Sequence, residues 1–390
     1  MSTSSSSTTT TTAYKTQIQQ IIECLKSDKT RKAALEILLS LSESPDLVDI
    51  FIETDLPKLM LRLLESDDIP ENELILQILI NLSATNEKYI NAFLSINTCH
   101  RVIRLLFNLI DSSLHKGESK LFNDPNDIMI SNDLLLDKNG NTFDMKLELD
   151  KYVINSSSIT NAHPDIKHET LINLYFMFIA NVTSYEQGQN KLIDVDNEKI
   201  CGIVYFKILD KYFEYIYHTC FDFCSSLIAN VSSIKRGREL LLENKIFKVF
   251  LIQFDKMNNM KVVNTLRLIR NCCFEYEKHH DELLVRDAVM FNYLIKILLM
   301  VNKSKKSGLD DVDVIYFTNF DHDKLSEDDK EVINDLIVDI FLIMTNHNEG
   351  VEFMKKKGVD KAIEVIEESC KIGEEKYKDR LSVIKNYLQN

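Results

Sequence analysis

An apolar segment that ends in asparagine occurs four times in this 390-residue chain. The copies end at Asn81, Asn181, Asn230 and Asn271, so the last three are spaced by 49 and 41 residues. A helical unit that returns about every 40 residues is typical of armadillo and HEAT repeats, because each unit buries its apolar face against the next one. The spacing therefore predicts an all-α, right-handed solenoid of the armadillo or HEAT type.

The composition agrees with a helical repeat protein. Only 9 glycines and 5 prolines accompany 45% hydrophobic residues, which leaves few turn residues for a many-stranded sheet. Each unit of a solenoid packs only on its neighbours, so a chain of this length can form one array. We therefore expect a single repeat domain from residue 14 to residue 390.

Three segments depart from the repeat pattern. Residues 2–12 are all serine or threonine, and such a tract has too little apolar surface to fold, so residues 1–13 are expected to be a disordered tail. Residues 115–165 contain clustered Gly, Pro, Asn and Asp and are predicted to be an insertion that is mostly loop. Within it, Asn139-Gly140 favours a short hairpin between residues 134–136 and 143–145. Residues 303–331 form a second polar insertion, an acidic loop whose apolar part, residues 312–317, should pack back on the repeats.

Two glycines keep a fixed distance from the repeated asparagines. Gly188 and Gly237 each follow their asparagine by seven residues. A repeat needs such a residue where one helix ends and the next unit begins. We therefore predict that both glycines are turn residues.

Charge and hydropathy limit the kinds of partner. The formal net charge of −14 argues against nucleic-acid binding, whose affinity comes mainly from neutralising phosphates. No apolar run reaches the length of about 18 residues that a membrane span needs, and the N-terminus lacks a basic-then-apolar signal sequence. The eight cysteines have no disulfide-framework spacing. The sequence therefore predicts a cytoplasmic, monomeric or weakly associating protein that binds neither membrane nor nucleic acid.

Patterns for catalysis or metal binding are missing from the sequence. It has no glycine-rich phosphate loop, no nucleophile elbow and no HExxH motif. Cys272, Cys273, His279 and His280 lie close enough in the sequence to suggest zinc. Adjacent cysteines on a helix, however, project about 100° apart and do not make a metal site by themselves. We therefore expect no cofactor, no metal and no enzymatic activity.

The repeated asparagines are the first candidates for binding. Helical geometry of about 100° per residue places Asn181 on the flank of an apolar face, half exposed. A row of asparagines can bind the backbone of an extended peptide, since each amide offers two donors and an acceptor. The alternative is that each asparagine bonds the loop of its own repeat or an adjacent helix. The candidate client-binding residues are Asn81, Asn181, Asn230, Asn271, Arg267, Arg270, Phe274 and His279.

The most distinctive segment is LRLIRNCCFE, from Leu266 to Glu275, which is followed by His279-His280 and Leu283-Leu284. In this pattern the chain resembles the Hgh family of eukaryotic armadillo-like proteins, and the likeness extends over most of residues 20–388. The resemblance implies a cytosolic adaptor that binds translation elongation factor 2 as a folding client and delivers it to the cytosolic chaperonin. It implies no established site residues, so the candidates above rest on physical arguments alone.

Two other functions remain open. A transport receptor for basic peptides would pair its asparagines with tryptophans, and this chain has no Trp. An armadillo scaffold would join two folded partners without a folding role. On the adaptor interpretation, alanine at Asn181, Asn230 and Asn271 should weaken client capture and leave the helix content unchanged.

Overall fold

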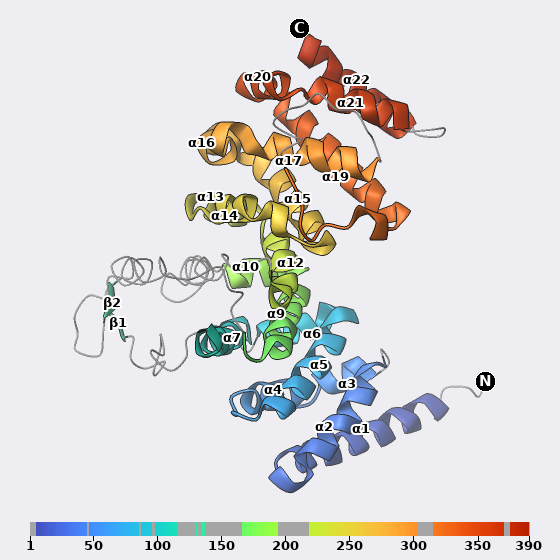
Figure 1. Ribbon diagram of the computed structural model, residues 1–390. Coiled ribbons are helices and arrows are strands. Elements are labelled where there is room, and N and C mark those ends of the chain that lie inside the picture. The colour runs from blue at the N-terminus through green and yellow to red at the C-terminus, as the bar shows by residue number, and fades with distance from the viewer. Residues whose placement is uncertain are drawn as a thin grey trace. The chain divides into compact units, whose positions relative to one another are not determined.

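The structure, a computed structural model, describes residues 5–44, 47–85, 87–95, 98–114, 129–131, 134–136, 166–193, 218–302, 315–369 and 375–389. Nearly all of these residues are helical (Figure 1), so the all-α prediction is confirmed. The chain divides into two compact units, residues 1–205 and 206–390, where the sequence suggests one domain from residue 14 to residue 390. A solenoid has no single closed core, so it can divide between neighbouring repeats.

The first unit is a stack of long helices flanked by shorter ones. Its helices are α1 (Ser5–Leu25), α2 (Asp28–Ser42), α3 (Val48–Ile52), α4 (Leu56–Leu63), α5 (Ile69–Thr85), α6 (Glu87–Leu94), α7 (Thr98–Leu114), α9 (Glu169–Thr183) and α10 (Glu186–Leu192). Helix α1 packs on α2, α2 on α5, and α5 on α9. The shorter helices α3, α6 and α10 pack on one another in the same order. Each repeat therefore adds one long helix to the stack, as the period predicts.

Local sequence explains where some of these helices begin and what holds them. Pro57 and Pro70 lie in the first turns of α4 and α5, where a proline loses no helical hydrogen bond. Between the helices, side chains such as Leu38, Leu79 and Phe178 are buried. Each buried side chain of this size stabilises the fold by roughly 1.5–3 kcal/mol relative to exposure.

The serine- and threonine-rich tail is more ordered than the sequence predicts. Residues 5–13 form the first turns of α1, although the composition predicts disorder for residues 1–13. A helix that is already nucleated lengthens at little cost, and this tract has neither Pro nor Gly to stop it. The nucleus is the packed part of α1, where Ile18 and Leu25 are fully buried. Residues 1–4 lie outside the described part of the chain.

The insertion at 115–165 is described only at two short strands. Strand β1 (Met129–Ser131) pairs antiparallel with β2 (Leu134–Leu136), with Met129 opposite Leu136. Residues 134–136 therefore form a strand as predicted, but its partner precedes it in the sequence. The two strands are separated by Asn132-Asp133, a two-residue connection of the kind that hairpins prefer. The predicted turn at Asn139-Gly140 lies outside the described residues.

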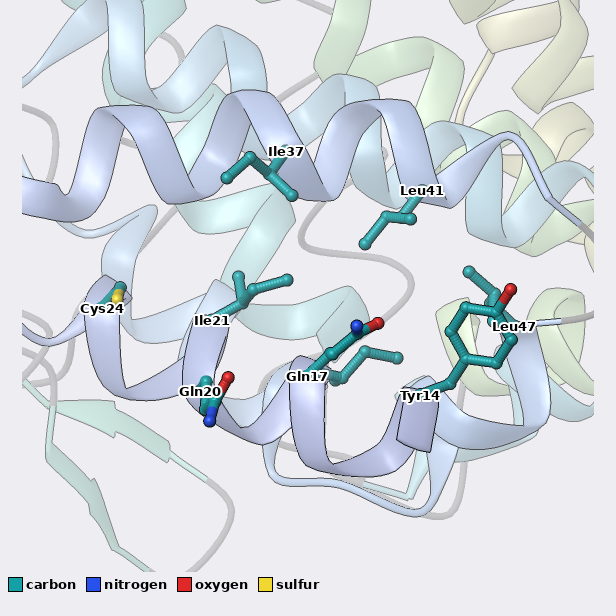
Figure 2. Close-up of a pocket in the computed structure, with 9 residues that line it drawn as sticks. Tyr14, Gln17, Gln20, Ile21, Cys24, Ile37, Leu41 and Leu47 are labelled. Carbon is teal, nitrogen blue, oxygen red and sulfur yellow. The ribbon is translucent and has the colours of Figure 1, made fainter. Parts of the chain in front are cut away.

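A groove of about 350 Å³ lies between α1 and α2 (Figure 2). Its walls are mainly apolar, and the exposed thiol of Cys24 lies among them. Figure 2 shows Tyr14 and Ile21 on α1 facing Ile37 and Leu41 on α2. None of the predicted binding residues lines this groove.

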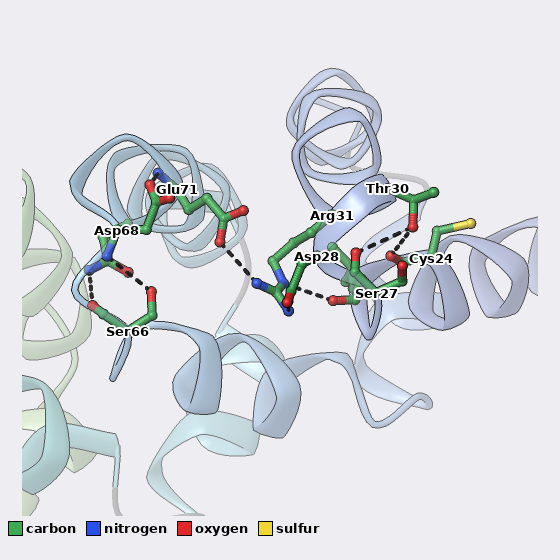
Figure 3. Close-up of polar contacts among 10 residues, drawn as sticks. Cys24, Ser27, Asp28, Thr30, Arg31, Ser66, Asp68 and Glu71 are labelled. Carbon is green, nitrogen blue, oxygen red and sulfur yellow. Dashed lines mark hydrogen bonds and ion pairs between the residues drawn. The ribbon is translucent and has the colours of Figure 1, made fainter.

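Polar contacts join the first helices on the side shown in Figure 3. Arg31 of α2 donates from Nε to the Leu25 carbonyl oxygen at the end of α1, at 3.0 Å. The same side chain donates from Nη1 to Glu71 Oε2 of α5, at 3.3 Å. Both charged side chains are largely shielded from solvent. Arg31 therefore links three successive helices of the stack.

The second unit repeats the same arrangement. Its elements are η4 (Thr219–Phe221), α12 (Asp222–Val231), α13 (Lys235–Glu243), α14 (Ile246–Ile252), η5 (Phe254–Lys256), α15 (Asn259–Cys272), η6 (Cys273–Glu275), α16 (Tyr276–Leu283), α17 (Val285–Val301), η7 (His322–Lys324), α19 (Glu327–Met344), α20 (Asn348–Lys357), α21 (Val359–Ser369) and α22 (Glu375–Gln389). Helices α12, α15, α19 and α22 pack in that order as its long-helix stack (Figure 1). Across the described ranges of both units, no helix combines the length and apolar character needed to cross a bilayer.

The second insertion ends earlier than predicted. Helix α19 begins at Glu327, so the last five residues of the predicted 303–331 loop belong to it. Ser326 and Asp329 form a capping box, and the acidic first turn is favourable beside the helix N-terminus. Residues 303–314 lie outside the described residues.

Residues 315–325, which we call the strap, pack back on the repeats as predicted for Phe317. The Phe317 ring lies 6.0 Å from Phe254 and 5.6 Å from Phe320, measured between centroids. The backbone N–H of Thr318 donates to the Asp255 carbonyl oxygen at 2.8 Å. The strap is therefore fixed to η5, while Tyr316 points to solvent with 76% of its surface exposed.

Gly188 and Gly237 are helical residues and not the turn residues that their offset predicts. Gly188 lies within α10 and Gly237 within α13. A methyl carbon added to Gly188 would stand 1.9 Å from the Val182 carbonyl oxygen, and one added to Gly237 would stand 2.0 Å from that of Val231. Both glycines are therefore required because their helix crosses the end of the preceding long helix at very short distance.

Candidate functional site

The repeated asparagines bond the preceding long helix of their stack. The amide nitrogen donates to a serine hydroxyl one repeat earlier, from Asn81 to Ser42 at 3.0 Å, from Asn181 to Ser83 at 3.2 Å and from Asn271 to Ser232 at 2.9 Å. All four predicted asparagines are half-buried, as the helical geometry predicts. The alternative of a bond to an adjacent helix is therefore confirmed for these three. Their role in client binding stays a prediction.

The serine that accepts each bond has a fixed place in the repeat. Ser83 follows Asn81 by two residues, and Ser232 follows Asn230 by two residues. The Ser232 hydroxyl also donates to the Ala229 carbonyl oxygen of its own helix at 2.6 Å. Its hydrogen is thus used within the helix, and its lone pairs face the next asparagine. The Asn-x-Ser sequence is a stacking motif in this protein.

Alanine at Asn271 is expected to destabilise the second unit by about 1 kcal/mol, because the buried Ser232 hydroxyl loses its donor. Urea denaturation followed by far-ultraviolet circular dichroism measures this change. A double-mutant cycle with Ser232→Ala should give a coupling of about 0.5 kcal/mol or more. Strictly additive effects would show that the bond contributes nothing to stability.

An exposed aromatic ring marks the end of α15. Phe274, in η6, exposes 56% of its surface. The guanidinium carbon of Arg270 lies 5.7 Å from the centroid of this ring, and that of Arg238 lies 6.0 Å from it. Both arginines are within the range of a cation–π interaction. The ring is therefore held between two cations and presented to solvent.

The cations around Phe274 are tied to carboxylates of neighbouring helices. Arg238 forms an ion pair with Glu275 at 2.8 Å, and both side chains are largely buried. The Arg270 Nε atom lies 3.4 Å from Asp339 Oδ2 on α19. Arg380 of α22 pairs with the same Asp339 and also with Asp335. We call the side chains of Arg238, Arg267, Arg270, Phe274, Glu275, Asp335, Asp339 and Arg380 the Phe274 face.

Arg267 differs from the other arginines of this face. Its side chain is exposed, and Nη1 donates to Asn264 Oδ1 at 3.1 Å. Asn264 is buried and in turn donates to the hydroxyls of Ser225 and Ser226 on α12. No carboxylate pairs with Arg267 within the described residues. Its guanidinium group is therefore positioned by a neutral amide, and no ion pair compensates its positive charge within the described residues.

His279, the eighth candidate, does not belong to the exposed face. It is only 7% exposed, and its Nε2 atom is buried without a hydrogen-bond partner among the described residues. The backbone of α16 departs from helical geometry at this residue, with φ −131° and ψ 32°. A buried side chain cannot act as a surface anchor, so the prediction for His279 is not supported by its position.

The adjacent cysteines are core residues. Cys272 and Cys273 are fully buried. Burial raises the pKa of the Cys273 thiol to about 12 and that of Cys272 well above its ordinary value. Both therefore stay protonated and unreactive near neutral pH. Among the described residues, no three His, Cys, Asp or Glu side chains gather in a way that could hold a metal ion.

Sequence reasoning identifies Arg267, Arg270 and Phe274 but misses Arg238, Asp339 and Arg380. The missed residues come from other repeats. A usable signal exists, because polar partners in this protein tend to lie about one repeat apart, as Arg238 and Glu275 do at 37 residues and Asp339 and Arg380 at 41. Opposite charges at that spacing predict contacts between stacked helices.

Comparison with solved structures supports the fold. A designed armadillo repeat protein in complex with the peptide (KR)4 superposes with a TM-score of 0.53 at 14% identity, over 86% of this chain and 100% of that one. A computationally designed armadillo repeat protein for modular peptide recognition gives 0.50 at 11% identity, over 83% and 98%. These identities carry information on the fold alone. The predicted armadillo-like solenoid is confirmed.

Comparison of sequences identifies relatives of this chain. Residues 166–334 match a family described as a domain of unknown function, DUF383. Protein HGH1 homolog of Dictyostelium discoideum is 32% identical over 149 residues, a match that spans 36% of this chain and 40% of that protein. The matched family segment contains the whole stretch from Leu266 to Glu275. The resemblance to the Hgh family is therefore confirmed over the matched part of the chain, which spans less than half of the length of this relative.

Proposed function

We propose that this protein is a non-enzymatic adaptor that binds translation elongation factor 2 as a folding client and delivers it to the cytosolic chaperonin. The proposal takes its biological content from the resemblance to the Hgh family. Its physical support is the Phe274 face, which includes residues of the long-helix stack of the second unit and of the neighbouring α13 and η6. The site of action would be the cytoplasm.

The observation that carries the proposal is the exposure of Phe274 between two arginines. Exposed aromatic side chains flanked by arginine are typical of binding hot spots, because both residue types combine apolar area with directed polar contacts. The ring is held by α15 and by the cations around it, so little conformational entropy would be lost on binding. An unfolded client offers the extended, partly apolar segments that such a surface can bind.

Armadillo scaffolds suit this task. Of the two designed armadillo proteins with a similar fold, one is in complex with a peptide and the other was made for peptide recognition. By analogy, the stack α12, α15, α19 and α22 would bind an extended client segment across its long helices. The half-buried asparagines already bond neighbouring helices, so apolar and arginine side chains would supply most of the client contacts.

Replacing Phe274 with alanine should reduce capture of translation elongation factor 2 about tenfold or more, because a central aromatic anchor contributes roughly 2 kcal/mol or more. The measurement is pull-down of unfolded factor by the purified protein, with the melting curve as a check on folding. Tyr316→Ala is the matched control, since this ring is also exposed but lies on the strap. Equal capture by both variants and the parent protein would rule out the Phe274 face as the client site.

The delivery step needs a separate experiment. Size-exclusion chromatography of this protein with the client and the chaperonin should yield a complex that contains all three. An armadillo scaffold with no folding role would bind folded elongation factor 2 as well as the unfolded form and would not prevent its aggregation. That result would favour the scaffold function over the adaptor.

A further inference from the structure

We propose that the Phe274 face selects acidic client segments that carry an aromatic or aliphatic side chain next to the acidic residues. This inference rests on the proposed function, because it names the chemistry of the segment that the same face would bind.

The Phe274 face differs from the whole chain in the sign of its charge. The face contains four arginines, Arg238, Arg267, Arg270 and Arg380, against the three carboxylates Glu275, Asp335 and Asp339. It therefore carries an excess of positive charge, although the whole chain has a formal net charge of −14. A local positive surface on an acidic protein attracts acidic segments and repels basic ones.

Arg267 is available to a carboxylate of the client. Its guanidinium group is exposed, and one of its N–H groups is held by Asn264. Arginine presents five N–H donors in a planar fork that matches a carboxylate. Since no carboxylate of the described chain pairs with Arg267, a client carboxylate can approach it without displacing an existing ion pair. Its orientation is fixed beforehand by the bond to Asn264, which lowers the entropic cost of binding.

Arg270 shares its carboxylate partner with a second arginine. Asp339 is shared between Arg270 and Arg380, and it lies closer to Arg380 than to the Nε atom of Arg270, which is 3.4 Å away. Arg270 also donates from Nη1 to Asn271 Oδ1 at 3.2 Å. The Arg270 Nε atom is buried and makes no hydrogen bond among the described residues. Asp339 therefore compensates Arg270 only partly, which leaves a second attractive site for negative charge beside Phe274.

The apolar requirement follows from the Phe274 ring. More than half of the surface of Phe274 is exposed, and the neighbours of its ring are the two guanidinium groups. An aromatic or aliphatic client side chain that covers this ring would remove apolar area from water. It would also shield the arginines from solvent, which strengthens their attraction to a nearby carboxylate. Acidic and apolar side chains together should thus bind better than either kind alone.

Fluorescence anisotropy with designed peptides tests the inference. The probe is a labelled 14-residue peptide, about as long as an extended segment that crosses several helices, in which Glu and Phe alternate with Gly and Ser. The two comparison peptides replace every Glu with Gln or with Lys. At low salt the full-length protein should bind the Glu peptide at least about tenfold more tightly than the Lys peptide, with the Gln peptide between them. Raising the salt concentration should reduce that difference.

Variants locate the binding. Arg267→Glu should weaken the Glu peptide about tenfold or more and should strengthen the Lys peptide. Lys248→Glu makes the same charge change at an exposed lysine of α14 and should alter neither affinity by more than about twofold. Phe274→Ala should weaken the Glu peptide without changing the order of the three peptides. Equal binding of the three peptides, preference for the Lys peptide, or equal effects of Arg267→Glu and Lys248→Glu would each overturn the inference.

The experiment separates this inference from the proposed function. If elongation factor 2 is captured in a way that depends on Phe274 but the peptides show no preference for Glu, the adaptor function stands and the acidic selectivity is wrong. If the Glu peptide binds as expected but elongation factor 2 is not captured, the face is an acidic-peptide site and the client assignment is wrong. Competition of the Glu peptide by a single-stranded oligonucleotide at equal charge would also contradict the inference, because it would indicate a site for any polyanion.

Discussion

Replacing Gly237 with alanine is expected to destabilise the second unit by about 3 kcal/mol, even though alanine is the better helix former. Helix propensity alone predicts a gain of about 1 kcal/mol. The added methyl carbon would stand 2.0 Å from the Val231 carbonyl oxygen and 2.9 Å from its carbonyl carbon, and both are backbone atoms. Relief therefore requires α13 to move away from the end of α12. Urea denaturation followed by far-ultraviolet circular dichroism measures the loss of stability.

Gly350→Ala is the matched control for this prediction. Gly350 occupies the corresponding place in α20, but its nearest neighbour is the Met344 carbonyl oxygen at 2.6 Å, followed by the flexible Met344 Cε atom at 3.0 Å. The two helices cross less closely at Gly350, so the loss of stability should be clearly smaller than for Gly237→Ala. Gly188→Ala, with 1.9 Å to Val182, should reproduce the large effect in the first unit. A Gly237→Ala protein as stable as the parent would show that the helices separate at no cost.

Replacing Asp222 with asparagine is expected to destabilise the second unit by about 3–5 kcal/mol. Lys261 has no exposed surface, and its ammonium group lies 2.8 Å from Asp222 and 2.6 Å from the His218 carbonyl oxygen. The substitution removes the compensating charge and leaves the ammonium buried with neutral partners. Thermal and urea unfolding of the full chain measure the change.

Lys261→Met provides the control and the pH test. Combined with Asp222→Asn it should restore most of the lost stability, because a buried ion pair can often be replaced by apolar groups at little cost. Burial lowers the pKa of Lys261 despite the opposing effect of Asp222. Below that lowered pKa the lysine is charged in both states, and folding carries the full desolvation cost. As pH rises toward the ordinary value of 10.5, only the unfolded chain keeps the proton, so the stability of the parent relative to Lys261→Met should increase. A flat or falling difference would contradict this sign.

The fold could be predicted from the sequence because the sequence pattern that indicates it is periodic. The spacing of Asn81, Asn181, Asn230 and Asn271 fixes the length of the repeat, and the apolar residues before each asparagine fix which face is buried. The division into two units and the helical state of residues 5–13 were not accessible. Composition reports only average tendencies, whereas helix extension depends on a packed nucleus elsewhere in the same helix.

The glycines show the limit of local reasoning most clearly. A glycine at a fixed offset predicts a turn when only its own segment is considered, but Gly188 and Gly237 lie inside helices. Their requirement comes from a carbonyl oxygen six residues earlier, on the helix that theirs crosses. The angle of that crossing is set by packing and leaves no trace in the propensity of single residues.

Only part of the candidate site could be predicted from the sequence, for a similar reason. Arg267, Arg270 and Phe274 stand together in one distinctive segment, so a motif finds them. The other three residues share no motif with it: Arg238 of α13 lies beside Phe274, Asp339 of α19 pairs with Arg270, and Arg380 of α22 pairs with Asp339. For His279 the motif suggests a surface residue, but the side chain is buried.

The bonds between asparagine and serine have a consequence for how such an array can change in length. Some repeats carry the asparagine and, two residues later, the serine. Such a repeat supplies the hydrogen-bond donor to the preceding repeat and the acceptor for the following repeat. Asn81 and Ser83 form such a pair, because Asn81 donates to Ser42 and Ser83 accepts from Asn181. Ser83 and Asn181 lie 98 residues apart with the whole 115–165 insertion between them, yet their bond is the same as that between Ser232 and Asn271 at a separation of 39. A repeat of this kind could be duplicated, deleted or followed by a long loop, and the repeats on either side would still have a matching asparagine donor and serine acceptor.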